Sequence, residues 1–260
     1  MRENTVKRTL AAGGVSVGTT VFEFATTGIA RIAAEAGADF VLFDTEHTGW
    51  SVETVRGLMA TARAADTVPL VRVPAAQYHL LAGPLDVGAM GLAVPMVESA
   101  EQACLIVRSA KYHPLGARGA GPGLAQDDYA GQRDIPARMR SANEEGLLIA
   151  QIETVAGVEA VDAIAATEGI DVLWIGGFDL STSLGIPARF DHPDYQRAVD
   201  RILNACARND KAPGYMAASV AEAQALIAQG FRWIAYWGDV WIYQEALRQG
   251  IAAIRPKATS

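Results

Sequence analysis

The feature that most constrains this chain is a short apolar run followed by a helical pattern, repeated eight times along its length. Residues 40–43, 147–150 and 172–175 are typical runs, and each is apolar throughout rather than alternating. Such runs are typical of strands that are covered on both faces. Because a helix separates one strand from the next, neighbouring strands must be parallel. Eight such units favour an α/β fold, the (β/α)8 or TIM barrel.

An open, doubly wound sheet is the alternative, although the first strand–helix turn lacks the GxGxxG fingerprint of that fold. The strands are predicted at 13–18, 40–43, 68–73, 90–95, 147–150, 172–175, 212–216 and 231–236. The helices are predicted at 4–12, 21–36, 52–65, 100–110, before 147, and at 155–166, 192–209, 220–229 and 240–254, with a helical turn at 78–82. Residues 112–134 are rich in Gly and Pro and too long for a simple connection, which indicates a lid or a subunit contact.

The length of 260 residues suits one domain, residues 1–260. A formal net charge of -7 argues against a nucleic-acid or anionic-membrane partner, since both require clustered Lys and Arg. No run approaches the roughly 18 apolar residues of a membrane span, and the polar N-terminus lacks a signal peptide. The two cysteines have no CxxC neighbour and are interpreted as small buried residues of a reducing compartment. We therefore expect a cytoplasmic protein.

Two carboxylates follow neighbouring strands of the predicted barrel. Glu153 comes after the run 147–150, and Asp179 comes after the run 172–175. If these strands are adjacent, both side chains emerge at one edge of the sheet and can form a hard-oxygen site for a divalent cation. The alternative is that Glu153 caps its helix and Asp179 opens the next one, because acidic residues are common in a first helical turn.

Other polar residues also fall at carboxyl ends of strands, where such barrels carry their chemistry. Arg72 has the fork geometry to hold a carboxylate or keto oxygen. His47 is suited to proton transfer near neutral pH, and Asp44 would orient it through a ring nitrogen. Each also has a simpler interpretation: Arg72 as a salt-bridged barrel residue, His47 as a loop histidine and Asp44 as a solvated loop charge.

The motifs around these residues resemble those of the HpcH/HpaI aldolases, the class II, metal-dependent pyruvate aldolases of the 4-hydroxy-2-oxo-heptanedioate aldolase type. The matching stretches span most of the chain in the order of that family. They are Phe43-Asp44-Thr45-Glu46-His47, Val71-Arg72-Val73-Pro74, the segment 85–98, Gly116-Ala117-Arg118-Gly119, Gln151-Ile152-Glu153-Thr154, Asp179-Leu180-Ser181 and the segment 230–239.

The resemblance implies a barrel of the phosphoenolpyruvate/pyruvate type that assembles as a homohexamer, a trimer of dimers, with its last helix exchanged between subunits. It implies a divalent metal ion such as Mg²⁺, Mn²⁺ or Co²⁺ and no organic cofactor. In the site that it implies, Glu153 and Asp179 bind the metal and Gln151 orients the metal shell. Arg72 contacts the keto oxygen, the backbone around Gly177, Phe178 and Asp179 holds the substrate carboxylate, and His47 with Asp44 handles the protons.

The activity implied is reversible aldol cleavage of 4-hydroxy-2-oxo acids to pyruvate, or a related 2-oxo acid, and an aldehyde, through a metal-stabilised enolate. Oxaloacetate decarboxylation or another C–C lysis on the same site is the alternative, and a barrel that binds a 2-oxo acid without turnover is the third hypothesis. The chain departs from the family in an acidic stretch at 121–129, expected to border the aldehyde end of the site, and at Phe178, expected to narrow the pocket.

Overall fold

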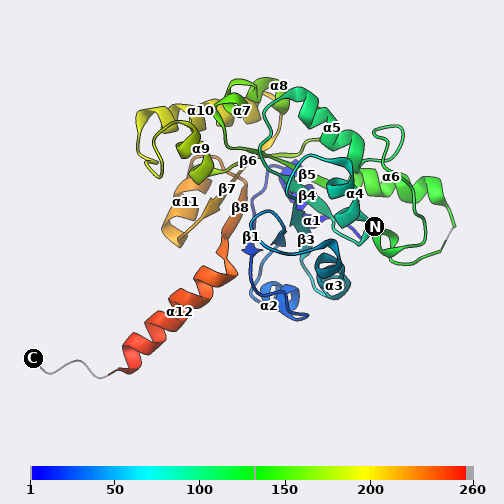
Figure 1. The fold of residues 1–260 in the computed structure, drawn as a ribbon, viewed down its shortest axis with the longest axis horizontal. Helices are drawn as coiled ribbons and strands as arrows, with labels where there is room; N and C mark the ends of the chain where they lie inside the picture. Colours follow the sequence, from blue (N-terminus) through cyan, green and yellow to red (C-terminus); the bar gives the residue numbers. More distant parts are fainter. Residues whose placement is uncertain (1, 132, 256–260) are drawn as a thin grey trace, which may run out of the picture.

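The computed structural model describes residues 2–131 and 133–255, and it contains a closed barrel of parallel strands in the order of the sequence (Figure 1). The closure of β1 against β8 confirms the (β/α)8 barrel and excludes the open sheet. The strands are β1 (Ser16–Val21), β2 (Phe40–Asp44), β3 (Val68–Arg72), β4 (Gly91–Val94), β5 (Leu147–Ile152), β6 (Val172–Ile175), β7 (Ala212–Ala217) and β8 (Trp233–Gly238).

Helices surround the barrel and alternate with its strands (Figure 1). They are α1 (Thr5–Ala11), α2 (Ile29–Glu35), α3 (Val52–Ala62), α4 (Tyr78–Asp86), α5 (Ala100–Ala110), α6 (Ile135–Glu145), α7 (Val155–Glu159), α8 (Val161–Ala165), α9 (Gly177–Ser183), α10 (Pro193–Arg208), α11 (Val220–Ala228) and α12 (Asp239–Ile254), with a 3₁₀ turn η1 (Ala125–Asp127). Ser51, Ser99 and Ser219 begin α3, α5 and α11 by accepting a hydrogen bond from an amide of the first turn.

Two buried apolar clusters explain why the strand sequences do not alternate. Phe40 and Leu42 point into the barrel, where the Phe40 ring stacks on Trp233 with ring centroids 4.5 Å apart. Val41 and Phe43, the residues between and after them, join the outer cluster that packs against the helices. Both faces of the strand are therefore buried, as expected for a parallel barrel.

The largest differences from the predicted elements lie at β1 and α2. The predicted strand at 13–18 begins later and ends at Val21, and the helix predicted from residue 21 begins only at Ile29. Residues 22–24 do not form a helix, because their backbone amides donate hydrogen bonds to the carboxylate of Asp239, which follows the last strand of the barrel. This contact is tertiary, so the local helical pattern could not reveal it.

Two helices also differ from their predicted bounds. The predicted helix 155–166 is divided at Ala160 into α7 and α8. The turn predicted at 78–82 continues as α4 through Pro84, because Leu81 and Leu85 on either side of this proline are both buried in the outer core. Packing of those side chains offsets the amide hydrogen bond that a proline cannot make.

Neither cysteine is paired, and their environments differ: Cys206 is buried as expected, whereas Cys104 is exposed. None of the helices in the described part of the chain is long and apolar enough to span a membrane.

Helix α12 extends away from the barrel instead of packing along it (Figure 1). Asp239, its first residue, is the only buried residue among those described in this helix. Large apolar side chains along the rest of the helix are exposed, namely Trp241, Tyr243, Leu247, Ile251 and Ile254. A single copy of the chain thus leaves the apolar surface of α12 uncovered.

Candidate active site

The predicted polar residues meet at the carboxyl ends of the strands. Asp44 and Arg72 are paired in register at the ends of β2 and β3. Ile152 of β5 is paired with Ile175 of β6, so Glu153 emerges beside the start of α9. A cavity of about 560 Å³ opens at this end of the barrel, and its lining includes His47, Arg72, Gln151, Gly177, Phe178 and Asp179.

Arg72 is held from several sides at the inner edge of this cavity. Its Nε donates to Oδ1 of Asp44 at 2.6 Å and lies 3.2 Å from Oε2 of Glu46. The guanidinium carbon lies 5.3 Å from the ring centroid of Trp174 and 5.8 Å from that of Phe22. The side chain is therefore both salt-bridged and part of the cavity lining, and the two interpretations of Arg72 are compatible.

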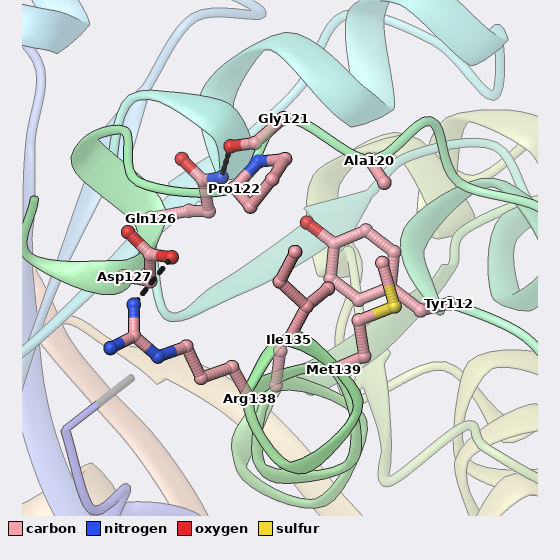
Figure 2. A pocket seen from close by; sticks show the side chains of 10 residues that line it. Tyr112, Ala120, Gly121, Pro122, Gln126, Asp127, Ile135, Arg138 and Met139 are labelled. Atoms are coloured by element: carbon pink, nitrogen blue, oxygen red, sulfur yellow. Dashed lines mark hydrogen bonds and ion pairs between the residues drawn. The ribbon is translucent and has the colours of Figure 1, made fainter. Parts of the chain in front are cut away.

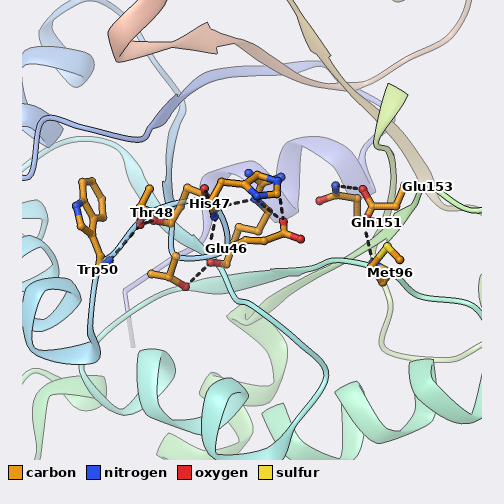
Figure 3. A network of polar contacts seen from close by, with 10 residues as sticks. Glu46, His47, Thr48, Trp50, Met96, Gln151 and Glu153 are labelled. Carbon is orange, nitrogen blue, oxygen red and sulfur yellow. Dashed lines mark hydrogen bonds and ion pairs between the residues drawn. The ribbon is translucent and has the colours of Figure 1, made fainter. Parts of the chain in front are cut away.

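The expected contact between Asp44 and the imidazole of His47 is wrong for this structure. The buried carboxylate of Asp44 accepts hydrogen bonds from the backbone amides of His47, at 2.9 Å, and Glu46, at 3.2 Å. The carboxylate nearest the ring is that of Glu46, with Oε2 3.7 Å from Nε2 of His47 (Figure 3). Asp44 thus shapes the loop that carries His47, and its own charge is paired with Arg72.

Glu46 lies within the matching stretch Phe43-Asp44-Thr45-Glu46-His47 but was given no role from the sequence, and the structure places it beside both Arg72 and His47. Its Oε2 atom is buried and, among the described residues, accepts no hydrogen bond. Burial raises the pKa of Glu46 to about 7, against the lowering effect of Arg72, while Asp44 and Asp179 raise it further. The spacing of Asp44 and Glu46, two residues apart after a strand, was the available signal.

Glu153 is almost fully enclosed, with 2% of its surface exposed. Its Oε1 accepts a hydrogen bond from the amide of Met96 at 2.7 Å, and its Oε2 accepts one from the side-chain amide of Gln151 (Figure 3). Burial raises the pKa of Glu153 to about 7; the two hydrogen bonds lower it, and the charges of Glu46 and Asp179 raise it. The hydrogen bonds to Glu153 are therefore not enough to offset its burial and the repulsion from neighbouring carboxylates.

Two glycines allow close packing at the start of α9, one against Glu153 and one against Tyr215. A Cβ atom at Gly176 would overlap Oε2 of Glu153, and one at Gly177 would lie 2.6 Å from the hydroxyl of Tyr215. Asp179 follows in the first turn of α9 and is exposed to the cavity. Glycine at position 176 thus lets Glu153 lie directly behind the wall of the cavity, and Asp179 lines that wall from α9.

This donor set fits a hard divalent cation. Glu153 and Asp179 supply two carboxylates, and Oε1 of the buried Gln151 has no hydrogen-bond partner among the described residues. Within residues 2–131 and 133–255, no group of three or more His, Cys, Asp or Glu side chains is arranged around a metal position. Two carboxylates and an amide oxygen are hard ligands of the type that Mg²⁺ and Mn²⁺ prefer, and they leave room for oxygen ligands from water and substrate.

Aromatic side chains line much of the remaining cavity, which the sequence did not predict. Trp237 and Trp241 line the cavity, whereas Trp233 is buried inside the barrel together with Trp174, which also reaches the cavity. Phe178 is 65% exposed and packs edge-on against Phe190 at the opening. The expected narrowing of the pocket by Phe178 agrees with this position.

The irregular segment 112–134 does not border the cavity within the single chain. None of its described residues is in the cavity lining. Tyr112, Gln126, Asp127 and Arg138 instead surround a separate cavity of about 20 Å³ (Figure 2). Arg118 anchors the segment through an ion pair to Asp86 at 2.6 Å. The expectation that residues 121–129 border the aldehyde end of the site is therefore wrong for one copy of the chain.

Comparisons with known proteins agree on one family. Residues 23–242 match the family model described as HpcH/HpaI aldolase/citrate lyase. A 2-keto-3-deoxy-L-rhamnonate aldolase of Klebsiella pneumoniae is 33% identical over 97% of this chain and 93% of its own. Among solved structures, an HpcH/HpaI aldolase from Desulfitobacterium hafniense superposes with a TM-score of 0.91 at 32% identity, covering 98% of each chain. The citrate synthase SbnG superposes with a TM-score of 0.86 at 30% identity, covering 96% of this chain and 97% of that one.

Proposed function

This chain belongs to the HpcH/HpaI aldolase/citrate lyase family and is an aldolase, a carbon–carbon lyase, and we propose that it cleaves and forms 4-hydroxy-2-oxo acids. The products of cleavage are pyruvate, or a related 2-oxo acid, and an aldehyde. The observation that carries the proposal is the convergence of two carboxylates with Arg72 at one cavity: Asp179 and Arg72 line it, and Glu153 lies directly behind Gly176 in its wall. A 2-oxo acid offers the complementary groups, a carboxylate and a keto oxygen.

Glu153 and Asp179 would hold a divalent cation such as Mg²⁺, Mn²⁺ or Co²⁺, with Gln151 orienting its surroundings. When bound, such an ion acts as a Lewis acid toward the oxygens of the 2-oxo acid. The proposed chemistry needs no organic cofactor, because the keto group itself accepts the electron pair released by C–C cleavage. Glu153 contributes a carboxylate that burial has already stripped of water, which strengthens its attraction for a cation.

Arg72 orients and stabilises the substrate in this proposal. Its Nε is engaged by Asp44 and Glu46, so its terminal nitrogens are the ones available to the keto oxygen. Negative charge grows on this oxygen as the C–C bond breaks, and a fixed guanidinium stabilises the charge without having to reorganise. The backbone at Gly177, Phe178 and Asp179, where α9 begins, would hold the substrate carboxylate.

His47 would move the proton between the aldol hydroxyl and the enolate carbon. Its side chain is 58% exposed at the cavity, where it can exchange protons with solvent. The carboxylate of Glu46 lies 3.7 Å from Nε2 of the imidazole, on the side away from solvent. Asp44 contributes by holding the loop from Glu46 to His47 in place through their backbone amides.

Deuterium exchange into the methyl group of pyruvate tests the proposal directly. The protein is incubated with pyruvate in D₂O, with chelator or with Mg²⁺ or Mn²⁺, and the methyl signal is followed by NMR. Exchange that requires the metal would support enolate formation, whereas no exchange with any of these metals would contradict it. Cleavage of 2-keto-3-deoxy-L-rhamnonate, which a relative's name gives as its substrate, is the first aldol reaction to assay.

The proposal extends to assembly and location: residues 1–260 act as one barrel domain in a cytoplasmic homohexamer, a trimer of dimers. The support is the uncovered apolar surface of α12, which a partner subunit would cover if this helix is exchanged. Native mass spectrometry of the full chain is expected to give a hexamer, and removal of residues 241–260 is expected to dissociate it. A monomeric full chain would contradict the proposed assembly.

A further inference from the structure

The loop after β1 is fixed by a carboxylate from the opposite end of the chain. Asp239 accepts hydrogen bonds from three consecutive backbone amides: Phe22 at 2.9 Å, Glu23 at 3.0 Å and Phe24 at 2.7 Å. A fourth comes from the amide of Val240, in its own helix, at 2.9 Å. Asp239 is 8% exposed, so these contacts are largely shielded from water. The start of α12 needs only the contact with its own amide, so the three bonds to residues 22–24 serve to fix the loop after β1.

The backbone before Asp239 is strained in a way that serves this contact. Trp237 has a φ of 44°, which is costly for a bulky residue. The pairing of β8 with β1 shifts its register next to it, where Thr20 lies opposite Gly238. Bulges of this kind re-aim the side chains that follow them and occur beside active sites. Here the shift in register lies directly before Asp239, whose carboxylate accepts the amides of residues 22–24.

The anchored loop places the ring of Phe22 against Arg72. The Phe22 ring centroid lies 5.8 Å from the guanidinium carbon of Arg72 and 5.0 Å from the ring centroid of Trp241. A Cβ at Gly238 would lie 2.7 Å from the Phe22 ring, so the space behind the ring is also closed. Phe22 and Trp174 together confine the guanidinium, while Asp44 and Glu46 hold its Nε.

We propose that Asp239 is a positioning residue for Arg72: it fixes the backbone of residues 22–24, and Phe22 then confines the guanidinium in the orientation that meets the 2-oxo acid. The proposal rests on the proposed function, because it takes Arg72 as the group that contacts the keto oxygen. Asp239 is not among the residues that line the cavity, so the role proposed for it is indirect. Its effect on turnover passes through Phe22.

Four variants test the proposal: Asp239→Asn, Phe22→Leu, the double variant of both, and Asp39→Asn as a control. Asp39 accepts the amide of Val17 at 2.8 Å, so the control makes the same change of charge at a carboxylate–amide contact at the opposite end of the same strand, β1. The rate of pyruvate methyl exchange with Mn²⁺ and its dependence on pyruvate concentration are measured for each. Hydrogen exchange, read by mass spectrometry, reports on the amides of residues 22–24.

Asp239→Asn is expected to lower kcat for exchange by roughly a hundredfold, since small misplacements of a positioning group have effects of this size, with a much smaller change in KM. The amides of residues 22–24 should lose protection. Phe22→Leu should lower kcat similarly but keep that protection, because the contacts to Asp239 are made by the backbone. The double variant should lose little more than either single variant, since both act through one path. Asp39→Asn should retain the wild-type rate.

The same data separate failure of this inference from failure of the proposed function. A wild-type rate in Asp239→Asn or Phe22→Leu, while Arg72→Lys is impaired, would overturn the positioning role alone. Losses that multiply in the double variant would also overturn it, because they would show two independent paths. A wild-type rate in Arg72→Lys would remove the proposed role of Arg72, and the inference with it. If Asp239→Asn does not fold, Phe22→Leu decides the question through its rate and its preserved loop protection.

Discussion

The two ends of the barrel differ in how completely their buried polar groups are paired. At the amino ends of the strands, Lys111 is buried, and its ammonium donates to the carbonyl oxygens of Asn143 at 2.6 Å and Gly146 at 2.7 Å. Asp171 there accepts the amide of Leu148 and pairs with Lys7. At the carboxyl ends, Oε2 of Glu46 and Oε1 of Gln151 are buried without a hydrogen bond from any described residue.

The difference indicates which end is built for stability and which for ligands. Charges at the amino ends have protein partners, so they hold α1, α5 and α6 to the barrel without any added group. At the carboxyl ends, Glu46 and Glu153 both have a raised pKa because burial and mutual repulsion are only partly offset. Such an arrangement costs stability in the free protein and is relieved by a cation or substrate. Variants at the two ends should therefore affect different properties.

The largest effect is expected for Glu153→Gln. This change removes one of the two proposed metal-binding carboxylates, and a bound ion contributes several kcal/mol, so pyruvate methyl exchange should fall by roughly four orders of magnitude. Binding of Mn²⁺, measured by calorimetry, should be lost in parallel.

The metal-free Glu153→Gln protein should be at least as stable as the wild type above pH 7. As pH rises from the pKa of Glu153 in the unfolded chain to its pKa of about 7 in the folded protein, the unfolded chain releases the proton first, so the free energy of unfolding of the wild type falls. The amide of the variant has no charge to bury. The side chain of Gln151 can also turn its free oxygen toward the new amide. A large drop in the thermal unfolding temperature of the variant would contradict the proposal that the carboxyl ends of the strands serve ligand binding at a cost in stability.

Arg72→Lys is expected to have the next largest effect, a loss of roughly a thousandfold in the exchange rate. An ammonium cannot bind Asp44 and Glu46 while also presenting a planar fork to the keto oxygen. Affinity for Mn²⁺ should change little, because Arg72 is not a proposed ligand. Retention of near wild-type exchange would rule out Arg72 as the contact to the developing negative charge.

His47→Ala should have a smaller effect, about a hundredfold on exchange, at the lower end for loss of an acid–base group. The ring is exposed and Glu46 lies beside it, so water and Glu46 can replace part of its role. Pyruvate affinity, measured by titration in the presence of Mn²⁺, should stay close to that of the wild type. Equal losses in binding and exchange would show that His47 binds the substrate instead of moving protons.

Lys111→Met, at the amino end, should leave exchange unchanged and alter stability and its dependence on pH. Burial lowers the pKa of Lys111 to about 7, with Lys7 and Arg118 lowering it further and Asp171 opposing them. Between about pH 7 and the pKa of this lysine in the unfolded chain, the unfolded chain binds the proton and the folded chain does not. The free energy of unfolding therefore rises with pH over this range.

The free energy of unfolding of the wild type relative to Lys111→Met should therefore increase by about 1 kcal/mol per pH unit above pH 7. Urea unfolding at pH 6, 7, 8 and 9 measures this difference. Below pH 7 the lysine is charged in both states and the difference should be constant. A difference that does not vary over this range would mean that Lys111 keeps an ordinary pKa in the folded protein.

The sequence alone was sufficient for the succession of parallel strands and the edge at which chemistry occurs, and it favoured a closed barrel over the open sheet that the pairing of β1 with β8 excludes. Runs such as 172–175 are apolar on both faces, and only a parallel sheet covered on both sides satisfies that pattern. Since parallel strands place their carboxyl ends at one edge, Arg72, Glu153 and Asp179 had to emerge together. Strand order and chain direction are enough for this conclusion.

Tertiary structure alone decided which of these groups contact one another. Asp44 was expected to bind the imidazole of His47, but it binds Arg72, because register pairs the last residues of β2 and β3. The helix predicted from residue 21 gave way to a loop because Asp239, more than two hundred residues later, binds its amides. Local patterns record which face of a strand or helix is buried. They cannot record which partner lies there, since contacts between distant segments exist only once the barrel has closed.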